Sequence, residues 1–505
     1  MALGASTSGF PMHVLLEGIS EYVLDKHGAN ITGLSCDSRR TNEGDLFLAY
    51  QGAQANGVDY IHDALAAGAI AVAVDAGFEY DAESYAVPLI PVANLRYQVG
   101  AIANRFFGYP SEHLNIVGVT GTNGKTSVCY FLAQALAGYE GNEAGLIGTL
   151  GYGQLPRLHA GMNTTPDPIT LQRLLADMCD EGINTVAMEV SSHGIEQCRV
   201  KGVKFNIAVF TNLTAEHLDY HGDMQTYAEV KRRLFLTKEL ECAVINCDDE
   251  YGRKLCAELS DKLRLVKYGI VDEFTEHVED SETVTAIIRY SRIESLCLEI
   301  DSPWGRGQLE ARLIGRFNAY NLLACLSTLC LLNVPFHEAL ERLSGVSSVP
   351  GRMEPFAVQG HACVIVDYAH TADAMEKSLS SLRQQCKGRL ICVFGCGGDR
   401  DTHKRPEMGR IVEQYADQVI VTSDNPRNEQ PESIIQDILA GMRHAERVIV
   451  TPDRAEAITC AIDSAVAEDI VLIAGKGHET YQEISGKRYP FSDRQLVRNI
   501  LGSGA

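Results

Sequence analysis

The residues best suited to do chemistry are those of the glycine-rich segment Gly121–Thr126, with the sequence GTNGKT. Gly121 and Gly124 permit a tight turn in which backbone amides point toward a polyphosphate. Lys125 can reach the outer phosphates, and the Thr126 hydroxyl can ligate a magnesium ion. The segment therefore predicts nucleotide binding rather than a merely structural turn.

The surroundings of this segment support the interpretation. A buried strand is expected from Ile116 and a helix from Lys125 to about Ala137, which is the strand–loop–helix order of a phosphate loop. The strict pattern has a glycine at position 119, but this chain has Val119 there and its glycine at Gly118.

Two further stretches could supply ligands. Glu189 stands near the end of the apolar run 185–190, where a carboxylate beside a phosphate loop can hold magnesium or orient water; the alternative is a surface carboxylate. The loop 212–223 carries His217, Asp219, His221 and Asp223, although a loop histidine is usually only solvated. Further on, Lys231-Arg-Arg233 is by itself typical of a solvated helix face.

Composition limits the class of protein. The chain has 505 residues, enough for about three domains, and its 45% hydrophobic and 22% charged residues are ordinary for a globular protein. Its formal charge of 44 − 66 = −22 argues against nucleic acid or an anionic membrane as the main partner. Lys and Arg side chains that meet anionic ligands must therefore be gathered locally.

The cysteines indicate a compartment. There are 15 of them and no C-x-x-C pair, which favours a reducing environment over a disulfide framework or zinc site. The N-terminal residues lack a basic and apolar leader pattern, and no apolar run approaches about 18 residues. We therefore expect a cytoplasmic protein.

We expect an α/β protein with three domains, at residues 1–110, 111–347 and 348–505. The first should contain a strand at 44–50 and a helix at about 60–67, with a linker at 108–111, where glycine and proline end a helix. Asn318 is suited to cap the apolar helix that follows Gly315 or to bind a base edge.

The third domain alternates apolar strands with helical stretches, which is typical of a parallel sheet covered by helices. The expected strands are 363–366, 390–394, 418–421, 447–450 and 470–474. Each runs into a polar loop, and ligands bind at the carboxyl ends of such strands. These loops are 367–370, 395–400, 423–427, 451–454 and 475–479.

Taken together, these motifs resemble the Mur ligases, ATP-dependent amide-forming enzymes of peptidoglycan precursor synthesis. The motifs are GTNGKT (121–126), NTTPD (163–167), MEVSSHG (188–194), FTNLTAEHLDYHGDM (210–224), GRFNAYN (315–321), PGRME (350–354), DYAHT (367–371), FGCGGDRD (394–401), DNPR (424–427) and GKGHE (475–479). The resemblance covers nearly the whole chain. It implies a P-loop ATPase-like central parallel sheet and a Rossmann-like C-terminal domain.

The resemblance also implies an activity: transfer of the ATP γ-phosphoryl group to the carboxylate of UDP-N-acetylmuramoyl-L-alanyl-D-glutamate, then attack on the acyl phosphate by meso-diaminopimelate. Such a transfer depends on positioning and charge neutralisation. By resemblance Lys125, Glu189, His217 and Lys231 are catalytic, with magnesium held by Thr126, Glu189, His217 and Lys231 as a CO₂-derived carbamate. ATP is expected at Gly121, Thr122, Asn123, Gly124, Lys125, Thr126, Ser127, Asn318, Arg352, Asp367 and His370.

The other two substrates are assigned in the same way. The resemblance places the UDP-substrate at Cys36, Ser38, Gln54, Asn163, Thr164, Thr165, Ser191, Gln197 and Arg199. It places diaminopimelate at Arg400, Asp424, Asn425, Pro426, Arg427, Gly475 and Glu479. A guanidinium can bind a carboxylate in bidentate fashion, and diaminopimelate differs from lysine by one carboxylate. Family members that add lysine lack the arginine of DNPR.

Two details depart from the family pattern. The segment 52–57 replaces a G-x-Q-x-D-G-like element, and Ala372 stands where a proline usually follows DYAHT. Three alternatives remain at this point: a lysine-adding ligase, a folylpolyglutamate synthase, or a non-catalytic nucleotide-binding protein of the cell-wall machinery. The DNPR loop argues against a lysine-adding ligase, and the N-terminal domain argues against a folylpolyglutamate synthase. The presence of all four expected catalytic residues argues against a non-catalytic protein. We expect a monomer whose third domain closes on the centre when ligands bind.

Overall fold

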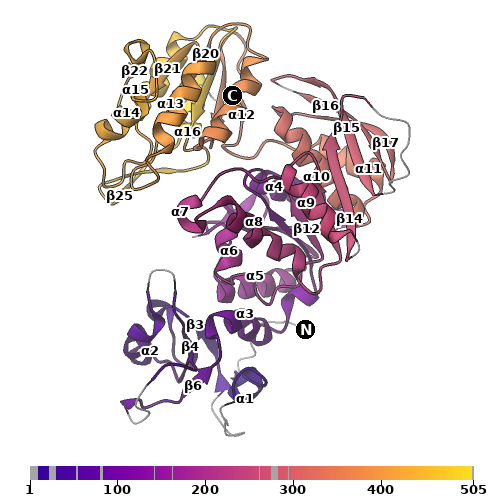
Figure 1. The fold of residues 1–505 in the computed structure, drawn as a ribbon, viewed down its shortest axis with the longest axis vertical. Helices are drawn as coiled ribbons and strands as arrows, with labels where there is room; N and C mark the ends of the chain where they lie inside the picture. Colours follow the sequence, from indigo (N-terminus) through magenta and orange to yellow (C-terminus); the bar gives the residue numbers. More distant parts are fainter. Residues whose placement is uncertain are drawn as a thin grey trace.

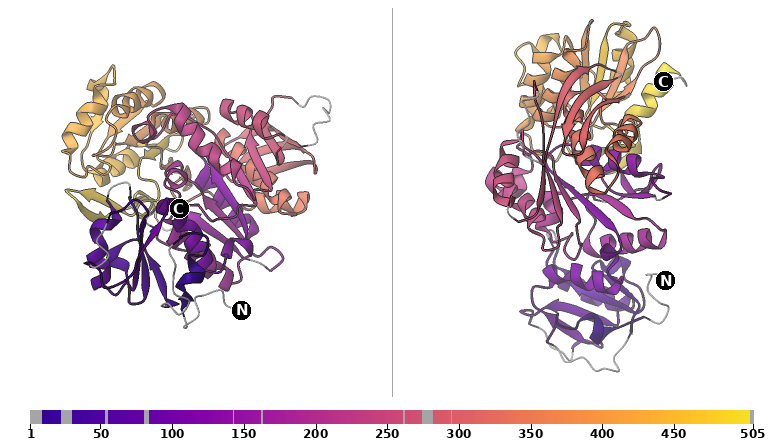
Figure 2. Two further views of the ribbon diagram at one scale, coloured as in Figure 1. Left: turned by 60° about the horizontal axis from the view of Figure 1, so that its bottom comes forward. Right: turned by 90° about the vertical axis from the view of Figure 1, so that its right-hand side faces the viewer.

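The structure, a computed structural model, describes residues 9–21, 30–52, 55–79, 84–141, 143–161, 163–260, 262–273, 282–293 and 295–502. It is an α/β protein in three parts (Figure 1). The N-terminal part lies at the bottom of Figure 1, the central part in the middle and the C-terminal part at the top, and Figure 2 shows the same succession from the side. Among the described residues, no helix has the length and apolar character needed to cross a bilayer.

The N-terminal part is built on a four-stranded parallel sheet in the order β3-β4-β5-β6. Its elements are β1 (Phe10–Pro11), α1 (Met12–Leu15), β2 (Asn30–Ile31), β3 (Gly33–Ser35), β4 (Asp45–Ala49), α2 (Ile61–Ala66), β5 (Ala71–Asp75), β6 (Leu89–Val92) and α3 (Leu95–Phe106). All five residues of β4 are buried, because helices or loops cover both faces of the sheet.

The central part is built on an eleven-stranded sheet in the order β10-β9-β8-β11-β7-β12-β13-β14-β15-β16-β17. Its strands are β7 (Asn115–Thr120), β8 (Ala144–Gly148), β9 (Gly151–Gln154), β10 (Arg157–His159), β11 (Thr185–Glu189), β12 (Ile207–Phe210), β13 (Cys242–Asn246), β14 (Arg264–Ile270), β15 (Thr283–Ser291), β16 (Leu296–Ser302) and β17 (Gly305–Ala311). Its helices are α4 (Lys125–Leu136), α5 (Pro168–Asp180), α6 (Ser192–Glu196), α7 (Leu218–His221), α8 (Met224–Arg232), α9 (Glu250–Leu259), α10 (Arg316–Leu331) and α11 (Phe336–Ser344).

Strand β7 lies between β11 and β12, and all three run parallel. Val117 and Val119 pack on the side of α4 and α10, whereas Ile116 packs on the side of α5. Each fully buried aliphatic side chain of this kind stabilises the fold by about 1.5–3 kcal/mol. The registers Val119↔Glu189 and Thr120↔Phe210 bring the carboxyl ends of the three strands to the same level.

The C-terminal part has a six-stranded sheet in the order β18-β19-β23-β20-β21-β22, parallel except for β18. Its elements are β18 (Glu354–Phe356), β19 (Cys363–Asp367), α12 (Ala372–Arg383), β20 (Leu390–Phe394), α13 (Lys404–Tyr415), β21 (Gln418–Val421), α14 (Pro431–Leu439), β22 (Ile449–Val450), α15 (Arg454–Ser464), β23 (Ile470–Ala474), β24 (Tyr481–Ile484), β25 (Lys487–Pro490) and α16 (Asp493–Leu501). The parallel, helix-covered sheet expected from the sequence is confirmed. The loops that follow its strands therefore share one edge.

Two local predictions need correction. Strand β22 begins at Ile449, not at Arg447, because residues 445–447 form a 3₁₀ turn before this exposed edge strand. The helix expected at about 60–67 is present as α2, which follows a 3₁₀ turn at residues 57–60. Helix α3 ends before residues 108–111, as expected, and Pro110 and Ser111 are buried in another 3₁₀ turn.

The second correction concerns helix α10. Gly315, with φ = 93°, stands at its N-cap. Asn318 lies inside the first turn, where its side-chain amide donates to the Ile314 carbonyl at 2.9 Å. It therefore does not cap the helix, and the other role expected for Asn318, contact with a base edge, stays a prediction.

Candidate active site

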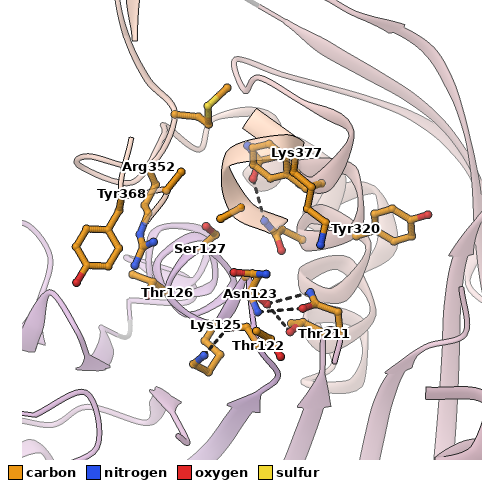
Figure 3. Close-up of a pocket in the computed structure, with 18 of the residues that line it drawn as sticks. Thr122, Asn123, Lys125, Thr126, Ser127, Thr211, Tyr320, Arg352, Tyr368 and Lys377 are labelled. Atoms are coloured by element: carbon orange, nitrogen blue, oxygen red, sulfur yellow. Dashed lines mark hydrogen bonds between the residues drawn. The ribbon is translucent and has the colours of Figure 1, made fainter. Parts of the chain in front are cut away.

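A cavity of about 1290 Å³ lies between the central and C-terminal parts. The phosphate loop forms its floor, and residues of both parts line it. Figure 3 shows Arg352 and Tyr368 on one side above Lys125 and Thr126, and Lys377 on the other side. The loop after β7 and the loop after β19 therefore face one cavity.

Hydrogen bonds to neighbouring residues fix the conformation of the phosphate loop. Thr122 N donates to the Asn212 carbonyl at 2.8 Å, and Thr211 Oγ1 donates to the Asn123 carbonyl at 2.6 Å. Lys125 Nζ folds back onto the carbonyls of Gly121 and Thr122 at 2.9 and 2.8 Å. The ammonium thus lies over the loop, where an anion would meet it.

The departure at position 119 has a structural explanation. Val119 is buried inside β7, so the phosphate turn itself begins only at Gly121. Gly118 serves packing instead, because a Cβ there would lie 2.7 Å from the ring of Phe205. Position 119, where the strict pattern has glycine, therefore lies in the strand and outside the turn.

We predict that Gly121→Ala weakens ATP binding by roughly 10- to 100-fold, because an alanine there would add about 1–3 kcal/mol of backbone strain. Gly121 has φ = 144°, and a Cβ there would lie 1.9 Å from Thr211 Oγ1. Gly138→Ala is the matched control, because Gly138 also has a positive φ of 67° but has open space around it. Calorimetric titration with ATP and magnesium compares the two; equal affinities would contradict the prediction.

Glu189 is brought to the phosphate loop by the pairing of β11 with β7. Its side chain is 1% exposed, and Thr126 Oγ1 donates to Oε2 at 2.9 Å. Thr149, at the end of β8, donates its amide to Oε1 at 2.7 Å and its hydroxyl to Oε2 at 3.3 Å. A Cβ on Gly148 would lie 2.3 Å from this carboxylate, so position 148 requires glycine. Thr149 carried no recognisable motif in the sequence.

Lys231 does not lie on a solvated face. Its side chain is 1% exposed, and Nζ donates to the Gly121 carbonyl at 2.8 Å and lies 4.5 Å from the ring centroid of Tyr227. Burial, followed by the nearby positive charge of Lys125, lowers the pKa of Lys231 well below its ordinary value. The environment thus favours a neutral amine beneath the phosphate loop.

Glu216 is a further residue that the sequence analysis missed. Its Oε1 lies 3.8 Å from His217 Nε2 and 3.9 Å from His370 Nε2. Burial alone would raise the pKa of Glu216, but Lys125 and the surrounding His and Lys side chains outweigh burial and lower it. A carboxylate at the junction of the two parts is thereby kept ionised. Only the position next to His217 could have hinted at it.

His217 lies beside this carboxylate at the start of α7, in the left-handed conformation with φ = 57°. His193 packs against it with a ring-centroid distance of 4.8 Å. Two other candidate residues of this loop, His221 and Asp223, make contacts of their own. His221 turns inward to Ser192, at 3.0 Å, whereas Asp223 caps helix α8 through the Thr226 amide.

The C-terminal part touches the phosphate loop directly through Asp373, at the start of α12. Its Oδ2 accepts hydrogen bonds from Asn123 Nδ2 at 3.0 Å and from Thr214 Oγ1 at 3.3 Å. Lys377 Nζ donates to the same oxygen at 2.8 Å. The cavity therefore contains charges from both parts of the chain.

The predicted ATP-binding residues of the C-terminal part line this cavity together with Asn318. Arg352 stacks on Tyr368, with its guanidinium carbon 4.2 Å from the ring centroid, and its buried Nε has no hydrogen-bond partner among the described residues. Asp367 accepts hydrogen bonds from the amides of Met353 and Tyr368 and from the Ser378 hydroxyl. Burial lowers the pKa of His370.

The residues predicted for the UDP-substrate are divided between two cavities. Cys36, Ser38 and Asn163 line a second cavity of about 1400 Å³ between the N-terminal and central parts. Thr164, Thr165, Ser191 and Arg199 line the first cavity, as does Asn163, which therefore marks where the two meet. Gln197 accepts two hydrogen bonds from Arg199, at 3.0 and 2.6 Å. Gln54 lies outside the described residues.

The residues predicted for the amino acid gather at the carboxyl edge of the C-terminal sheet. Arg427 Nη1 donates to the Gly398 carbonyl at 2.6 Å, and a Cβ on Gly397 would lie 2.9 Å from Arg427 Nη1 and 3.8 Å from Arg400 Cγ. The two arginines thus flank one turn. Asn425 Nδ2 donates to Glu479 Oε2 at 2.8 Å. Of this set only Arg400 also lines the first cavity, between the central and C-terminal parts.

The residues present fit a magnesium–nucleotide complex in which the protein would supply some of the metal ligands and the nucleotide would supply others. Among the described residues, no group of three or more His, Cys, Asp or Glu side chains is gathered to hold a metal. A hydroxyl and a carboxylate, Thr126 and Glu189, lie together beside the loop, and such oxygen donors suit magnesium, which usually keeps phosphate oxygens and waters as its other ligands. The unpartnered Arg352 Nε is a donor suited to an anion.

Comparison with known proteins identifies the family. Profiles described as Mur ligase family, catalytic domain; Mur ligase middle domain; and Mur ligase, glutamate ligase domain match residues 30–107, 119–329 and 351–477. The UDP-N-acetylmuramoyl-L-alanyl-D-glutamate–2,6-diaminopimelate ligase of Coxiella burnetii is 50% identical over 475 residues, covering 93% of this chain and 96% of the relative. The ligase of the same name from Chromobacterium violaceum is 46% identical, covering 95% and 96%.

A solved structure agrees with these relatives. A UDP-N-acetylmuramoyl-L-alanyl-D-glutamate–2,6-diaminopimelate ligase has a TM-score of 0.69 and 33% identity, covering 98% of this chain and 99% of its own. Sequence and structure therefore lead to the same conclusion. The chain belongs to the Mur ligase family.

Proposed function

We propose that this protein is the ATP-dependent ligase that joins meso-2,6-diaminopimelate to UDP-N-acetylmuramoyl-L-alanyl-D-glutamate. The observation that carries the proposal is the cavity between the central and C-terminal parts, where Lys125, Glu189 and Glu216 face Arg352 and His370. A carboxylate and a triphosphate can meet there only if cations neutralise them, because two anions repel each other. The high identity to diaminopimelate ligases supports this choice of substrate.

The proposed roles follow from position. Lys125 would neutralise the outer phosphates. Thr126 and Glu189 would hold one magnesium ion, and His217 and Lys231 as a carbamate would contribute to a second. When bound, these ions would supply charge neutralisation for phosphoryl transfer. An oxygen of the acceptor carboxylate attacks the γ-phosphorus of ATP, which gives an acyl phosphate and releases ADP. The neutral amino group of diaminopimelate then attacks the carbonyl carbon of the acyl phosphate, loses a proton and releases phosphate.

The carbamate proposal has support in the location of Lys231. Lys231 is 1% exposed, and its Nζ lies beneath the phosphate loop near the cation Lys125. An ammonium in such a place is unfavourable, whereas a CO₂ adduct would turn the side chain into an anion suited to magnesium.

The UDP-substrate spans the two cavities in this proposal. The uridine end would lie at Cys36 and Ser38, and the peptide end would pass Asn163 toward Arg199 and the phosphate loop. We further propose domain limits at residues 1–110, 111–347 and 348–505. The cytoplasmic location, the monomeric state and the closure of the third domain stay predictions.

The experiment that tests the proposal is phosphate release with ATP, magnesium and UDP-N-acetylmuramoyl-L-alanyl-D-glutamate, comparing meso-diaminopimelate with L-lysine. Lysine leaves Arg427 without its carboxylate partner, so we expect turnover with diaminopimelate and a kcat/KM for lysine lower by roughly 10⁴-fold. Equal turnover with lysine would refute the role of Arg427. No turnover with either amino acid would favour the non-catalytic alternative.

A further inference from the structure

A fully buried lysine lies beneath the loops predicted to bind the amino acid. Lys476 follows strand β23, and its side chain is 0% exposed. Its Nζ donates to Glu479 Oε2 at 2.7 Å and to Asn425 Oδ1 at 3.0 Å. Because it has no exposed surface, this ammonium cannot itself meet a substrate in this arrangement.

The three polar side chains form a closed ring. Asn425 Nδ2 donates to Glu479 Oε2 at 2.8 Å, so that one carboxylate oxygen receives both the amide and the ammonium. Among the described residues, no hydrogen bond to the other oxygen, Oε1, is present, and the Glu479 side chain is 18% exposed. Two donors thus fix one oxygen and leave the second for a ligand.

The ring is held by the backbone around it. Glu483 N donates to Asn425 Oδ1 at 2.9 Å, and Gln482 Nε2 donates to the Asp424 carbonyl at 2.7 Å. Gly475 adopts φ = 114°, and a Cβ there would lie 2.5 Å from Asp424 Oδ2. The positions of Asn425 and Glu479 are therefore set by a buried network rather than by solvent.

We propose that Lys476 is a positioning residue that aims Glu479 Oε1 at the distal ammonium of the amino-acid substrate and so contributes to selecting a diamino acid. The inference rests on the proposed function. A carboxylate that rotates freely loses side-chain entropy when it binds an ammonium. A carboxylate with one oxygen already held by hydrogen bonds loses less, because its second oxygen is already in position.

The test is a double-mutant cycle of Lys476→Met and Glu479→Gln in the full-length protein, with KM for meso-diaminopimelate, KM for ATP and kcat measured for each variant. We expect Lys476→Met to raise KM for diaminopimelate by roughly 10- to 100-fold, the loss typical of hydrogen bonds to charged groups. KM for ATP and kcat at saturating diaminopimelate should stay within about 3-fold. The double variant should be no worse than Glu479→Gln alone, because Lys476 acts through Glu479.

Lys487→Met is the matched control, because Lys487 is an exposed lysine on strand β25 of the adjoining hairpin. It should behave as the wild type. If Lys476→Met does not fold, Lys476→Gln is used for the test, since it removes the charge but keeps a donor. It should raise KM for diaminopimelate and leave KM for ATP and kcat within about 3-fold of the wild type.

The outcomes separate this inference from the proposed function. No turnover of the wild type with diaminopimelate would overturn both. Wild-type turnover with an unchanged KM in the Lys476 variant would overturn only the inference, as would effects that multiply in the double variant. An equal rise in KM for diaminopimelate and in KM for ATP would overturn the inference and mean that Lys476 only stabilises the fold.

Discussion

Replacing Lys231 with alanine should lower kcat by roughly 10³-fold, the scale of losing one electrostatic group at a phosphoryl-transfer site. The side chain is buried under the phosphate loop with Nζ 2.8 Å from the Gly121 carbonyl. Removing it would take away the proposed carbamate and leave a gap of about the length of that group. A small carboxylic acid such as acetate should enter the gap and restore part of the activity.

The measurement is phosphate release by Lys231→Ala across a concentration series of acetate. Arg233→Ala is the control, because Arg233 is two residues away but forms an exposed ion pair with Glu196. It should keep wild-type activity and show no response to acetate. Full activity of Lys231→Ala without any added acid would refute the carbamate.

Replacing Glu189 with glutamine should lower kcat by roughly 10²- to 10³-fold and raise the magnesium concentration needed for half-maximal rate. The substitution keeps the shape of the side chain. Thr149 N would still find an oxygen, and the hydroxyls of Thr126 and Thr149, which donate to Glu189, can accept from the new amide. The fold should therefore survive while the anionic ligand is lost.

A magnesium titration of the rate at fixed ATP, with a thermal melt of the same preparations, checks this result. Glu250→Gln is the control, since Glu250 is exposed and forms an ion pair with Lys254 one turn along α9. An unchanged magnesium dependence in Glu189→Gln would show that Glu189 is not a metal ligand. A large fall in melting temperature would instead assign it a structural role.

The cross-domain contacts explain why these side chains depend on the whole chain. Glu216 lies 3.9 Å from His370, and Asn123 is hydrogen-bonded to Asp373, 250 residues away in the sequence. No local pattern connects such residues. Their proximity follows from how the loop after β7 and the loop after β19 meet across the cavity (Figure 3).

The sequence by itself determined the phosphate loop, the α/β class and the strands of the C-terminal sheet, because glycine placement and apolar periodicity act over a few residues. It erred where a weak local signal competed with context, as at Asn318 and at the start of β22. Only the tertiary structure decided that Val119 belongs to a buried strand and that Lys231 is buried. It also decided that Glu216 lies beside His217 and His370, and that Lys476 is buried against Glu479. Their environments are set by sheet register and by packing between distant segments, which one sequence does not encode in any short pattern.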